Sequence, residues 1–481
     1  MEEILGMGVK QILELVTSKK ISAEQVAKTF VERMKKYKDK NAILEIFDDA
    51  VDNAKKVDEK IKNGQKVGKL AGVPFVIKDN MLYKGHKASC ASKFLENFVS
   101  PYTATAVQKL LDEDAVILGR ANMDEFAMGG SNENSAFGPC KNAWDDGRVA
   151  GGSSGGSAVA VALGMCAAAL GTDTGGSVRQ PSSFNGVVGI KPTYGRISRF
   201  GIVAFASSFD QVGPITKNVE DNAYLLQILA GCDKNDQTTL TDEPQDYSQN
   251  INGLIKGKKI GFCKQLIDKF KSSESYVHFE KILKFFQDNG ATLLEIDIPK
   301  IELALPVYYI LATAEATSNL GRFDGVKYTT RTCTSSDIKK LYVQSRTAGF
   351  GDEVKRRIML GNFVLSSGYF DAYYNKAKKV QQYVKKSFEQ AFEKCDVLVM
   401  PVTYGEAFKI GEKNNDPVTM YLEDMFTVVA NIAGIPAISV PYAKGENYMP
   451  IGLQILSKQL GEADVYTVAN FVEKNWKGER Q

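Results

Sequence analysis

Two short stretches rich in glycine and serine stand close together near the middle of the chain, and both could position a nucleophile. The first reads GGSSGGS over residues 151–157, and the second reads GTDTGGSVRQP over residues 171–181. Glycines before a serine let the backbone turn sharply and leave room for a substrate. Consecutive backbone N–H groups in such a turn can bind the charge that develops on a carbonyl oxygen. The pattern therefore indicates acyl-transfer chemistry at a serine.

GGSSGGS could also be a flexible linker or a phosphate-binding loop. A linker should join segments of different character, whereas this stretch lies inside a continuous α/β region. A Walker A loop needs a lysine directly before its Ser or Thr, but Ala158 and Val159 follow here. The GxGxxG spacing of a dinucleotide loop is missing as well. Both alternatives are therefore weaker than the catalytic interpretation.

A serine nucleophile needs a base, and the chain contains two histidines, His86 and His278. Neither KGHKAS nor YVHFE is typical of a catalytic site, and a Ser–His–Asp triad would have to use His86. Lys78 is the other candidate because it ends the apolar stretch VPFVIK, where burial would lower the pKa of its ammonium. A strand-end lysine can equally extend to solvent, so Lys78 is not diagnostic by itself.

The elements that must hold these residues alternate between apolar strands and helices. Strands are predicted at residues 72–80, 114–119, 167–172, 396–401 and 436–441, and helices at 103–113, 158–165 and 353–394. This alternation indicates an α/β layered fold. We expect an N-terminal helical segment at residues 1–65 packed on a large domain at 66–481. The polar, lysine-rich segment 233–275 is a plausible seam between subdomains.

The first helices show a start signal in the sequence. Ser22 and Gln25 have capping-box spacing, with Ile21 and Val26 at the hydrophobic-staple positions. The helix that follows should place one apolar face on the body of the protein, formed by Val26, Phe30, Val31 and Met34.

Composition narrows the function classes. The 481 residues carry a formal net charge of +3, which argues against a dedicated nucleic-acid binder. The seven cysteines are scattered without CxxC spacing, so a disulfide scaffold and a zinc site are both poor interpretations. The N-terminus lacks the pattern of a signal peptide, and no apolar run is long enough to predict a membrane span. We expect a cytoplasmic protein without a metal site.

Lys78, the Ser153/Ser154 pair and Ser177 together resemble the amidase signature family, whose lysine-to-serine and serine-to-serine spacings they match. The resemblance implies a single large domain with a mixed β-sheet core between α-helices. It also implies a Lys–Ser–Ser triad in which Ser177 forms the acyl-enzyme, Ser153 follows a cis peptide bond and relays protons, and Lys78 is the base. The implied oxyanion hole is the backbone of Thr174, Gly175 and Gly176. Ser154 and Ser157 are expected to support the turn and the helix start.

Longer stretches resemble one branch of the family, the glutamine-hydrolysing subunits of tRNA-dependent amidotransferases. They include residues 123–139, 186–216, 312–328, 353–361, 367–374 and 431–441. Carried across, Arg357 in KRRIMLG binds the carboxylate of glutamine and Asp424 in YLEDMFT faces its amino group. Weaker candidates for lining the pocket are Tyr308, Gly129 and Ser131. From composition alone, Arg357 and Asp424 could equally be surface charges of helices.

The resemblance also implies partners. Ammonia would pass to a B subunit, where ATP and Mg are used to convert misacylated Glu-tRNA(Gln), with Asp-tRNA(Asn) left open as a second substrate. A small C subunit is a further expected partner, and the sequence leaves open an assembly of two or three subunits. No cofactor is expected in this chain. Asp173 and Arg179 flank the nucleophile as orienting residues or as a structural pair. Residues 139–150 follow the family loosely, which concerns a surface and not the triad.

Two other functions remain at this stage. One is a stand-alone amidase acting on small amides, which would not need Arg357 and Asp424. The other is a catalytically inactive scaffold, against which the intact Lys78, Ser153 and Ser177 speak. A cysteine-type glutaminase is poorly supported because no Cys–His pairing is apparent.

Overall fold

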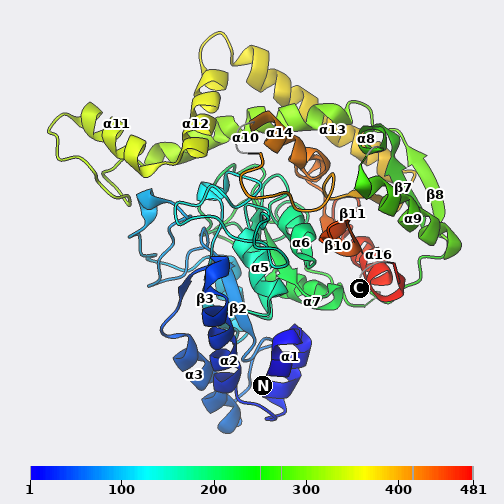
Figure 1. The fold of residues 1–481 in the computed structure, drawn as a ribbon, viewed down its shortest axis with the longest axis horizontal. Coiled ribbons are helices and arrows are strands. Elements are labelled where there is room, and N and C mark those ends of the chain that lie inside the picture. The colour runs from blue at the N-terminus through cyan, green and yellow to red at the C-terminus, as the bar shows by residue number, and fades with distance from the viewer. Residues whose placement is uncertain (1, 250, 272, 414–416, 479–481) are drawn as a thin grey trace.

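The computed structural model of the protein describes residues 2–249, 251–271, 273–413 and 417–478. An 11-stranded sheet runs through it in the order β1-β3-β2-β4-β6-β5-β10-β11-β9-β7-β8 (Figure 1). The strands are β1 (Ile43–Ile46), β2 (Pro74–Lys78), β3 (Val116–Ala121), β4 (Ala168–Asp173), β5 (Val188–Lys191), β6 (Gln211–Thr216), β7 (Lys259–Cys263), β8 (Thr292–Ile296), β9 (Val397–Pro401), β10 (Ala437–Lys444) and β11 (Pro450–Leu456).

Helices cover the sheet. They are α1 (Val9–Thr17), α2 (Ala23–Lys36), α3 (Ala50–Lys62), α4 (Thr105–Asp112), α5 (Gly155–Ala162), α6 (Arg179–Asn185), α7 (Val219–Leu229), α8 (Lys264–Phe270), α9 (Glu274–Asp288), α10 (Ala304–Asn319), α11 (Ile338–Gly349), α12 (Asp352–Leu365), α13 (Lys376–Phe392), α14 (Pro417–Leu422), α15 (Val428–Ala433) and α16 (Glu462–Asn475). The five strands predicted by residue range correspond to β2, β3, β4, β9 and β10.

The sheet is mixed, which confirms the expected fold class. Strand β2 pairs in parallel with β3 and β4, and β9, β7 and β8 are parallel to one another at the other end. Between these groups β4, β6, β5, β10, β11 and β9 pair antiparallel. The segment 233–275 contains β7, which lies next to the last strand of this same sheet, so the sheet extends into the expected seam.

The N-terminal segment begins as predicted. Ser22 Oγ accepts a hydrogen bond from the Gln25 amide, and Gln25 Oε1 accepts one from the Ser22 amide, so the capping box forms at the start of α2. Val26, Phe30 and Met34 are buried, as expected. The segment also contains β1, an antiparallel edge strand on β3 that was not predicted. The boundary near residue 65 stays a prediction.

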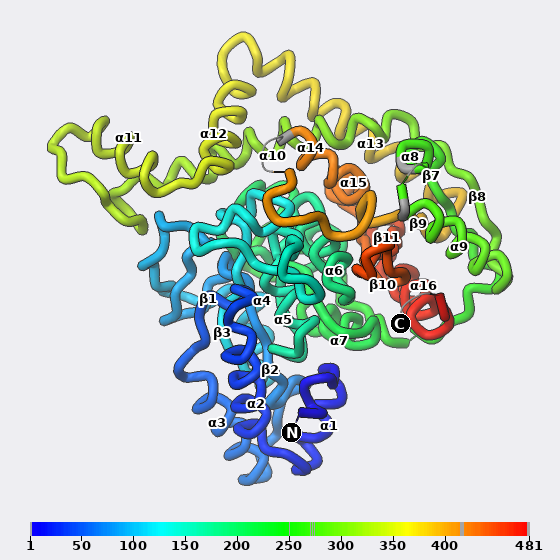
Figure 2. Tube along the Cα trace, viewed as in Figure 1, coloured from blue at the N-terminus to red at the C-terminus, as the bar shows by residue number. Residues whose placement is uncertain are grey.

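Helices α5 and α6 fill the centre of the molecule, where Figures 1 and 2 show them surrounded by the rest of the chain. Helix α5 is buried from Gly155 to Val161 and α6 is buried from Arg179 to Asn185. The small residues of α5 allow this complete burial because they let neighbouring elements approach its backbone. The glycine-serine stretch and the start of α6 are therefore held rigidly inside the core.

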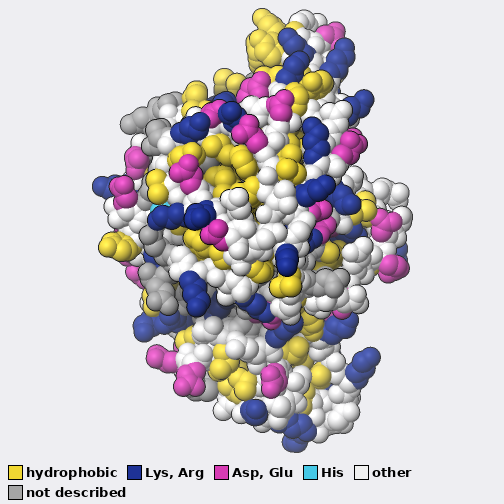
Figure 3. All heavy atoms as spheres, turned by 90° about the vertical axis from the view of Figure 1, so that its right-hand side faces the viewer, with side chains coloured by type: hydrophobic (Ala, Val, Ile, Leu, Met, Phe, Trp, Pro, Cys, Tyr) yellow, Lys and Arg dark blue, Asp and Glu magenta, His cyan; other side chains and the backbone are white. Residues whose placement is uncertain are grey.

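The molecular surface carries both signs of charge. Figure 3 shows acidic and basic side chains interspersed with apolar ones over the face that lies at the right of Figure 1. Helices α11 and α12 project from the body at the top of Figure 1. The balanced surface agrees with the formal net charge of +3.

Candidate active site

Lys78 ends β2 inside the protein, with its side chain fully buried. Its Nζ donates hydrogen bonds to Ser153 Oγ at 2.7 Å, Ser154 Oγ at 2.8 Å and Thr172 Oγ1 at 2.9 Å. Burial lowers the pKa of Lys78 to about 7, although nearby negative charges, with Asp124 the largest, act against this shift. A lysine in this state can hold or release a proton near neutral pH, which suits a general base.

Ser153 and Ser154 directly precede α5 in the chain, and their hydroxyls contact Lys78 at the end of β2. The peptide bond from Gly152 to Ser153 is cis, as the family resemblance implied. Ser154 is the N-cap residue of α5, but its hydroxyl makes no capping hydrogen bond. Instead it accepts from Lys78 and donates to the Thr172 carbonyl at 3.1 Å. Ser154 therefore anchors the lysine, a role beyond the turn support expected from the sequence.

Ser177 lies in the turn between β4 and α6 with 7% of its surface exposed. The Ser154 amide donates to the Ser177 carbonyl at 3.1 Å, so the two glycine-serine stretches are joined directly. The Ser177 hydroxyl makes no hydrogen bond to any described residue, Ser153 included. Such hydrogen bonds often form only once substrate is bound, and the unengaged hydroxyl is available for that contact.

Asp173 and Arg179 stabilise the turn that carries Ser177. Asp173 accepts hydrogen bonds from the Gly176 amide at 3.0 Å and from the Val178 amide at 3.1 Å. Arg179, fully buried, pairs with the same carboxylate through Nε at 3.0 Å and Nη2 at 2.9 Å. Burial would raise the pKa of Asp173, but the Arg179 charge and hydrogen bonds outweigh it and hold the pKa at about 2. The pair therefore fixes the backbone around Ser177.

The same turn offers backbone donors for an oxyanion. The Gly176 N–H already donates to Asp173, whereas the Gly175 and Ser177 N–H groups donate to no group in the described ranges. The Ser177 amide is thus available as a donor in the turn, beside the backbone of Thr174, Gly175 and Gly176 expected from the sequence. A side chain at Gly175 would place its Cβ 2.6 Å from the Tyr308 ring, so only glycine fits there. Tyr308 is buried and closes this side of the turn.

Arg357 lies on α12 in an aromatic cage, 4% exposed. Its Cζ is 5.5 to 5.6 Å from the ring centroids of Phe205, Tyr309 and Tyr421. Nε donates to Glu353 at 2.8 Å, while the two terminal nitrogens donate to no residue that the structure describes. Burial works against the cation, but Glu353 more than offsets it and raises the pKa. The free face of this guanidinium can bind a carboxylate.

Tyr309 connects Asp424 with Arg357. Its hydroxyl donates to the Asp424 carboxylate at 2.6 Å, and its ring is one of those around the guanidinium. Burial of the carboxyl raises the pKa of Asp424 to about 7. A Cβ built on Gly130 would lie 3.7 Å from Asp424 Oδ1, so the backbone of residues 129–131 runs past this acid. The structure thus brings a cation, an anion and a strip of backbone together.

Gly129 and Ser131 occupy that strip beside Asp124. A Cβ at Gly129 would lie 2.4 Å from the Asp124 carboxylate, which leaves no room for a side chain. Ser131 is 1% exposed, and its Oγ accepts from the Glu133 amide at 3.4 Å. Gly129 therefore packs directly against Asp124, and the Ser131 side chain is turned to its own backbone strip.

Other candidates lie away from this constellation. His86 stacks on Tyr83 with ring centroids 4.3 Å apart and is 3.4 Å from Asp49. Burial raises the pKa of Cys140 far above its usual value and the pKa of Cys166 to about 12, so neither is an activated thiol. Within the described ranges no cluster of His, Cys, Asp or Glu could hold a metal ion. None of the helices described there has the length and apolar character needed to cross a bilayer.

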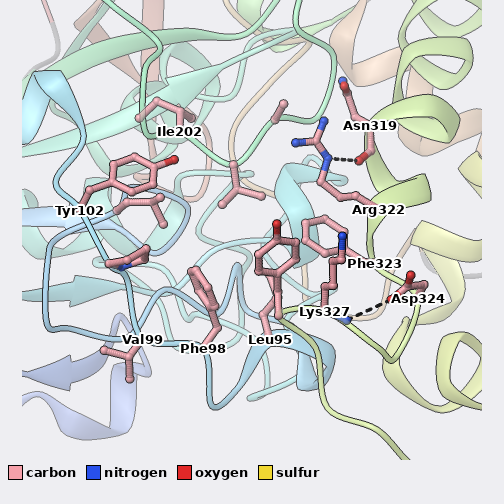
Figure 4. Close-up of a pocket in the computed structure, with 15 residues that line it drawn as sticks. Leu95, Phe98, Val99, Tyr102, Ile202, Asn319, Arg322, Phe323, Asp324 and Lys327 are labelled. Atoms are coloured by element: carbon pink, nitrogen blue, oxygen red, sulfur yellow. Dashed lines mark hydrogen bonds between the residues drawn. The ribbon is translucent and has the colours of Figure 1, made fainter. Parts of the chain in front are cut away.

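A separate cavity of about 610 Å³ lies beside the site (Figure 4). Apolar residues such as Phe98, Tyr102 and Ile202 line it, and Arg322 and Asp324 stand at its edge. The chain continues from this wall into Phe205 of the Arg357 cage. Lys78, Ser153, Ser177, Arg357 and Asp424 are not among the residues that line the cavity, so it is separate from the candidate site.

Several contact residues were not predicted from the sequence. They are Ser154 on the lysine, and Glu353, Phe205, Tyr309 and Tyr421 around the arginine and Asp424. Glu353 could have been found, because it stands four residues before Arg357 on a predicted helix. The aromatic residues belong to three distant segments, and no local pattern in the sequence joins them.

The geometry can be compared with known proteins. The family model for Amidase matches residues 25–466. The chain is 50% identical to the A subunit of the glutamyl-tRNA(Gln) amidotransferase of Caldanaerobacter subterraneus subsp. tengcongensis, covering 99% of this chain and 97% of that one. The crystal structure of the corresponding A subunit from Thermotoga maritima matches with a TM-score of 0.81 and 40% identity, covering 98% and 95%. A peptide amidase from Stenotrophomonas maltophilia matches with a TM-score of 0.84 and 25% identity, covering 98% of each chain.

Proposed function

The chain belongs to the amidase family, and from this premise we propose that it is the glutamine-hydrolysing subunit of a tRNA-dependent amidotransferase. The observation that carries the proposal is the pairing of two constellations in one site. Lys78 Nζ lies 2.7 Å from Ser153 Oγ next to the Ser177 turn. Beside it stand the buried cation Arg357 and the acid Asp424, joined by Tyr309. Glutamine needs both charges because it is a zwitterion, whereas a neutral amide needs neither.

In the proposed reaction Ser177 Oγ attacks the side-chain carbonyl carbon of glutamine. Neutral Lys78 takes a proton from Ser153, which takes the proton of Ser177. Ser177 is thus deprotonated as it attacks, and no free alkoxide has to form first. The amides of Gly175 and Ser177 stabilise the negative charge on the carbonyl oxygen, with Thr174 in the same turn. The Lys78 ammonium returns a proton through Ser153 to the leaving nitrogen, and ammonia departs.

Water then attacks the acyl-enzyme and gives a proton through Ser153 to Lys78. The Lys78 ammonium returns a proton through Ser153 to Ser177 Oγ as glutamate leaves. Arg357 holds the α-carboxylate and Asp424 the α-ammonium, so the side-chain amide is presented to Ser177. Tyr308, Gly129 and Ser131 line the substrate. The role of Asp173 and Arg179 is to hold the turn, because their hydrogen bonds go to its backbone and not to the pocket.

The ammonia serves a second reaction on a partner. The names of the relatives, which designate one part of an amidotransferase, support an assembly with a B subunit together with a small C subunit. There ATP and Mg activate Glu-tRNA(Gln) for conversion to Gln-tRNA(Gln), or Asp-tRNA(Asn) to Asn-tRNA(Asn). The proposed compartment is the cytoplasm, where aminoacyl-tRNA is used.

The experiment that tests the proposal compares two amides. Butyramide is the glutamine side chain without the zwitterion. We expect the purified protein with its co-expressed partner subunits to release ammonia from glutamine far faster than from butyramide. Ser177→Ala should abolish release from both, while Ser100→Ala, a buried serine outside the site, should leave it unchanged.

Efficient hydrolysis of butyramide by the chain alone, with little release from glutamine, would contradict the assignment. It would favour a stand-alone amidase acting on small amides. Full activity in Ser177→Ala would instead overturn the choice of nucleophile.

A further inference from the structure

Asp124 and Glu125, two adjacent acids in the stretch MDEFAMGG, have their hydrogen-bond partners in different parts of the chain. Asp124 contacts the glycine-serine stretch, because its amide donates to the Ser153 carbonyl at 3.3 Å. Its carboxylate accepts from the Asn132 amide at 2.9 Å and the Asn134 amide at 3.1 Å. Asp124 is fully buried. It therefore connects the backbone of residues 132–134 with Ser153, two residues before α5.

Glu125 contacts the start of the helix that carries Arg357. One carboxylate oxygen accepts from the Gly351 amide at 2.7 Å and the other from Ser92 Oγ at 2.5 Å. Gly351 is the N-cap residue of α12, the helix that carries Glu353 and Arg357. A negative charge at a helix N-terminus is also favoured by the helix dipole. Glu125 thus contacts the backbone at the start of α12 directly.

The contact of Glu125 with Gly351 is shielded from water. Glu125 is 2% exposed, and the neighbouring residues Phe126 and Phe350 pack their rings together, with Phe94 against Phe350. Burial raises the pKa of Glu125 to about 7, while the hydrogen bonds from Ser92 and Gly351 act against this shift and favour the ionised carboxylate. A Cβ at Gly351 would lie 2.4 Å from Glu125 Oε2, so the close approach requires glycine at this position.

Arg357 follows Gly351 by six residues, which is about 9 Å along the axis of an α-helix. A shift at the start of α12 therefore moves the guanidinium relative to Asp424 and to the strip 129–131. Asp124 and Glu125 are neighbours in the chain, and their hydrogen bonds to Ser153 and to Gly351 connect the glycine-serine stretch with the start of α12.

We propose that Glu125 is a positioning residue for the substrate: it fixes α12 so that Arg357 meets the carboxylate of glutamine while the amide reaches Ser177. The inference rests on the proposed function and adds a residue that does not touch the substrate. It predicts an effect on binding of the zwitterion and not on the chemical step.

Steady-state kinetics of the complex with its partner subunits test this role. We expect Glu125→Ala to raise KM for glutamine at least tenfold and to change kcat by less than about threefold. Glu125→Gln keeps one acceptor oxygen for Gly351 or Ser92, so its KM should stay within about threefold of wild type. Gly351→Ala should resemble Glu125→Ala because its methyl group would displace the carboxylate.

A double-mutant comparison separates positioning from general damage. Arg357→Met alone should raise KM, and adding Glu125→Ala to it should raise KM no further, because both changes remove one function. Full additivity of the two changes, or a loss confined to kcat, would overturn the proposal. If Glu125→Ala does not fold, Ser92→Ala removes one donor and should give a smaller rise in KM in the same direction.

Hydrogen–deuterium exchange provides a readout that does not depend on activity. Amides at the start of α12, residues 352–356, should exchange faster in Glu125→Ala than in wild type, while those of α5 should not change. If wild type does not hydrolyse glutamine, the proposed function fails, and this exchange result still decides whether Glu125 holds the helix. An unchanged exchange rate of the amides of residues 352–356 would by itself contradict the positioning role.

Discussion

Lys78 differs from an ordinary buried lysine in what its Nζ contacts. Lys191 is also fully buried, and burial lowers its pKa to about 7 as well. Its Nζ, however, donates to the carbonyls of Pro192 at 2.9 Å and Ile435 at 2.6 Å. Lys78 instead contacts the hydroxyls of Ser153 and Ser154, which can pass protons onward. The neighbours, and not burial alone, mark Lys78 as the candidate base.

Because the lowered pKa leaves Lys78 neutral above about pH 7, we expect kcat/KM for glutamine to be constant above that pH. Below it, kcat/KM should fall about tenfold per pH unit as the base becomes protonated. Lys78→Arg should lower kcat by at least about 100-fold, since a guanidinium stays charged. Lys191→Arg is the matched change at a lysine outside the site and should not alter the pH profile.

Asp424 titrates in the same range, because burial raises its pKa to about 7. The profile of Asp424→Asn distinguishes the two groups. Retention of the acidic limb in that variant assigns the limb to Lys78, and its disappearance would assign it to Asp424.

At the scale of elements, one short segment joins the substrate acid to the nucleophile turn. The 3-10 helix η8 (Glu423–Phe426) and α15, with the residue between them, carry Asp424, Thr427 and Asn431. Thr427 Oγ1 donates to the Gly175 carbonyl at 2.6 Å, and Asn431 Nδ2 donates to the Asp173 carboxylate at 2.9 Å. The segment therefore holds the backbone of the turn that carries the proposed oxyanion donors.

Replacing Thr427 by the isosteric valine removes the hydrogen bond to Gly175 without changing side-chain size. We expect Thr427→Val to lower kcat about three- to tenfold, the range that one hydrogen bond is worth. Thr427→Ser keeps the hydroxyl and should stay near wild type. Equal losses in both variants would show that packing of the γ-methyl group, and not the hydrogen bond, supports the turn.

At the scale of the whole molecule, the N-terminal helices are attached to the core through polar contacts as well as apolar ones. Asp221 on α7 is buried and accepts from the Val9 amide at 2.8 Å and the Lys10 amide at 3.1 Å. These amides are the unsatisfied donors at the start of α1. A residue 212 positions away from Val9 in the sequence thus performs the capping of this helix.

Asp221→Ala should therefore lower the free energy of unfolding by about 1–2 kcal/mol, the usual cost of losing a helix cap. Urea denaturation followed by circular dichroism measures it. Glutaminase kcat should stay within about twofold of wild type, because Asp221 contacts none of the site residues. Asp221→Asn keeps one acceptor and should lose less stability; an unchanged midpoint in Asp221→Ala would contradict the capping role.

The sequence by itself was sufficient to predict the α/β class, five strands and the amphipathic face of α2. These features follow from local periodicity, which is set by neighbouring residues. Strands β5, β6 and β11 were missed because their short runs contain glycine and proline, which favour turns when the fold is unknown. The candidate residues Lys78, Ser153 and Ser177 were found from glycine-serine spacing together with the family resemblance.

Only the tertiary structure decided which side chains meet. Arg357 acquires its aromatic cage from Phe205, Tyr309 and Tyr421, which come from three segments far apart in the chain. Glu125 reaches Gly351 across 226 positions. Local sequence carries no trace of such contacts, because they arise from the order of strands in the sheet and the packing of helices on it. Residue types and spacing therefore indicated the chemistry, and the geometry that permits it came from the fold.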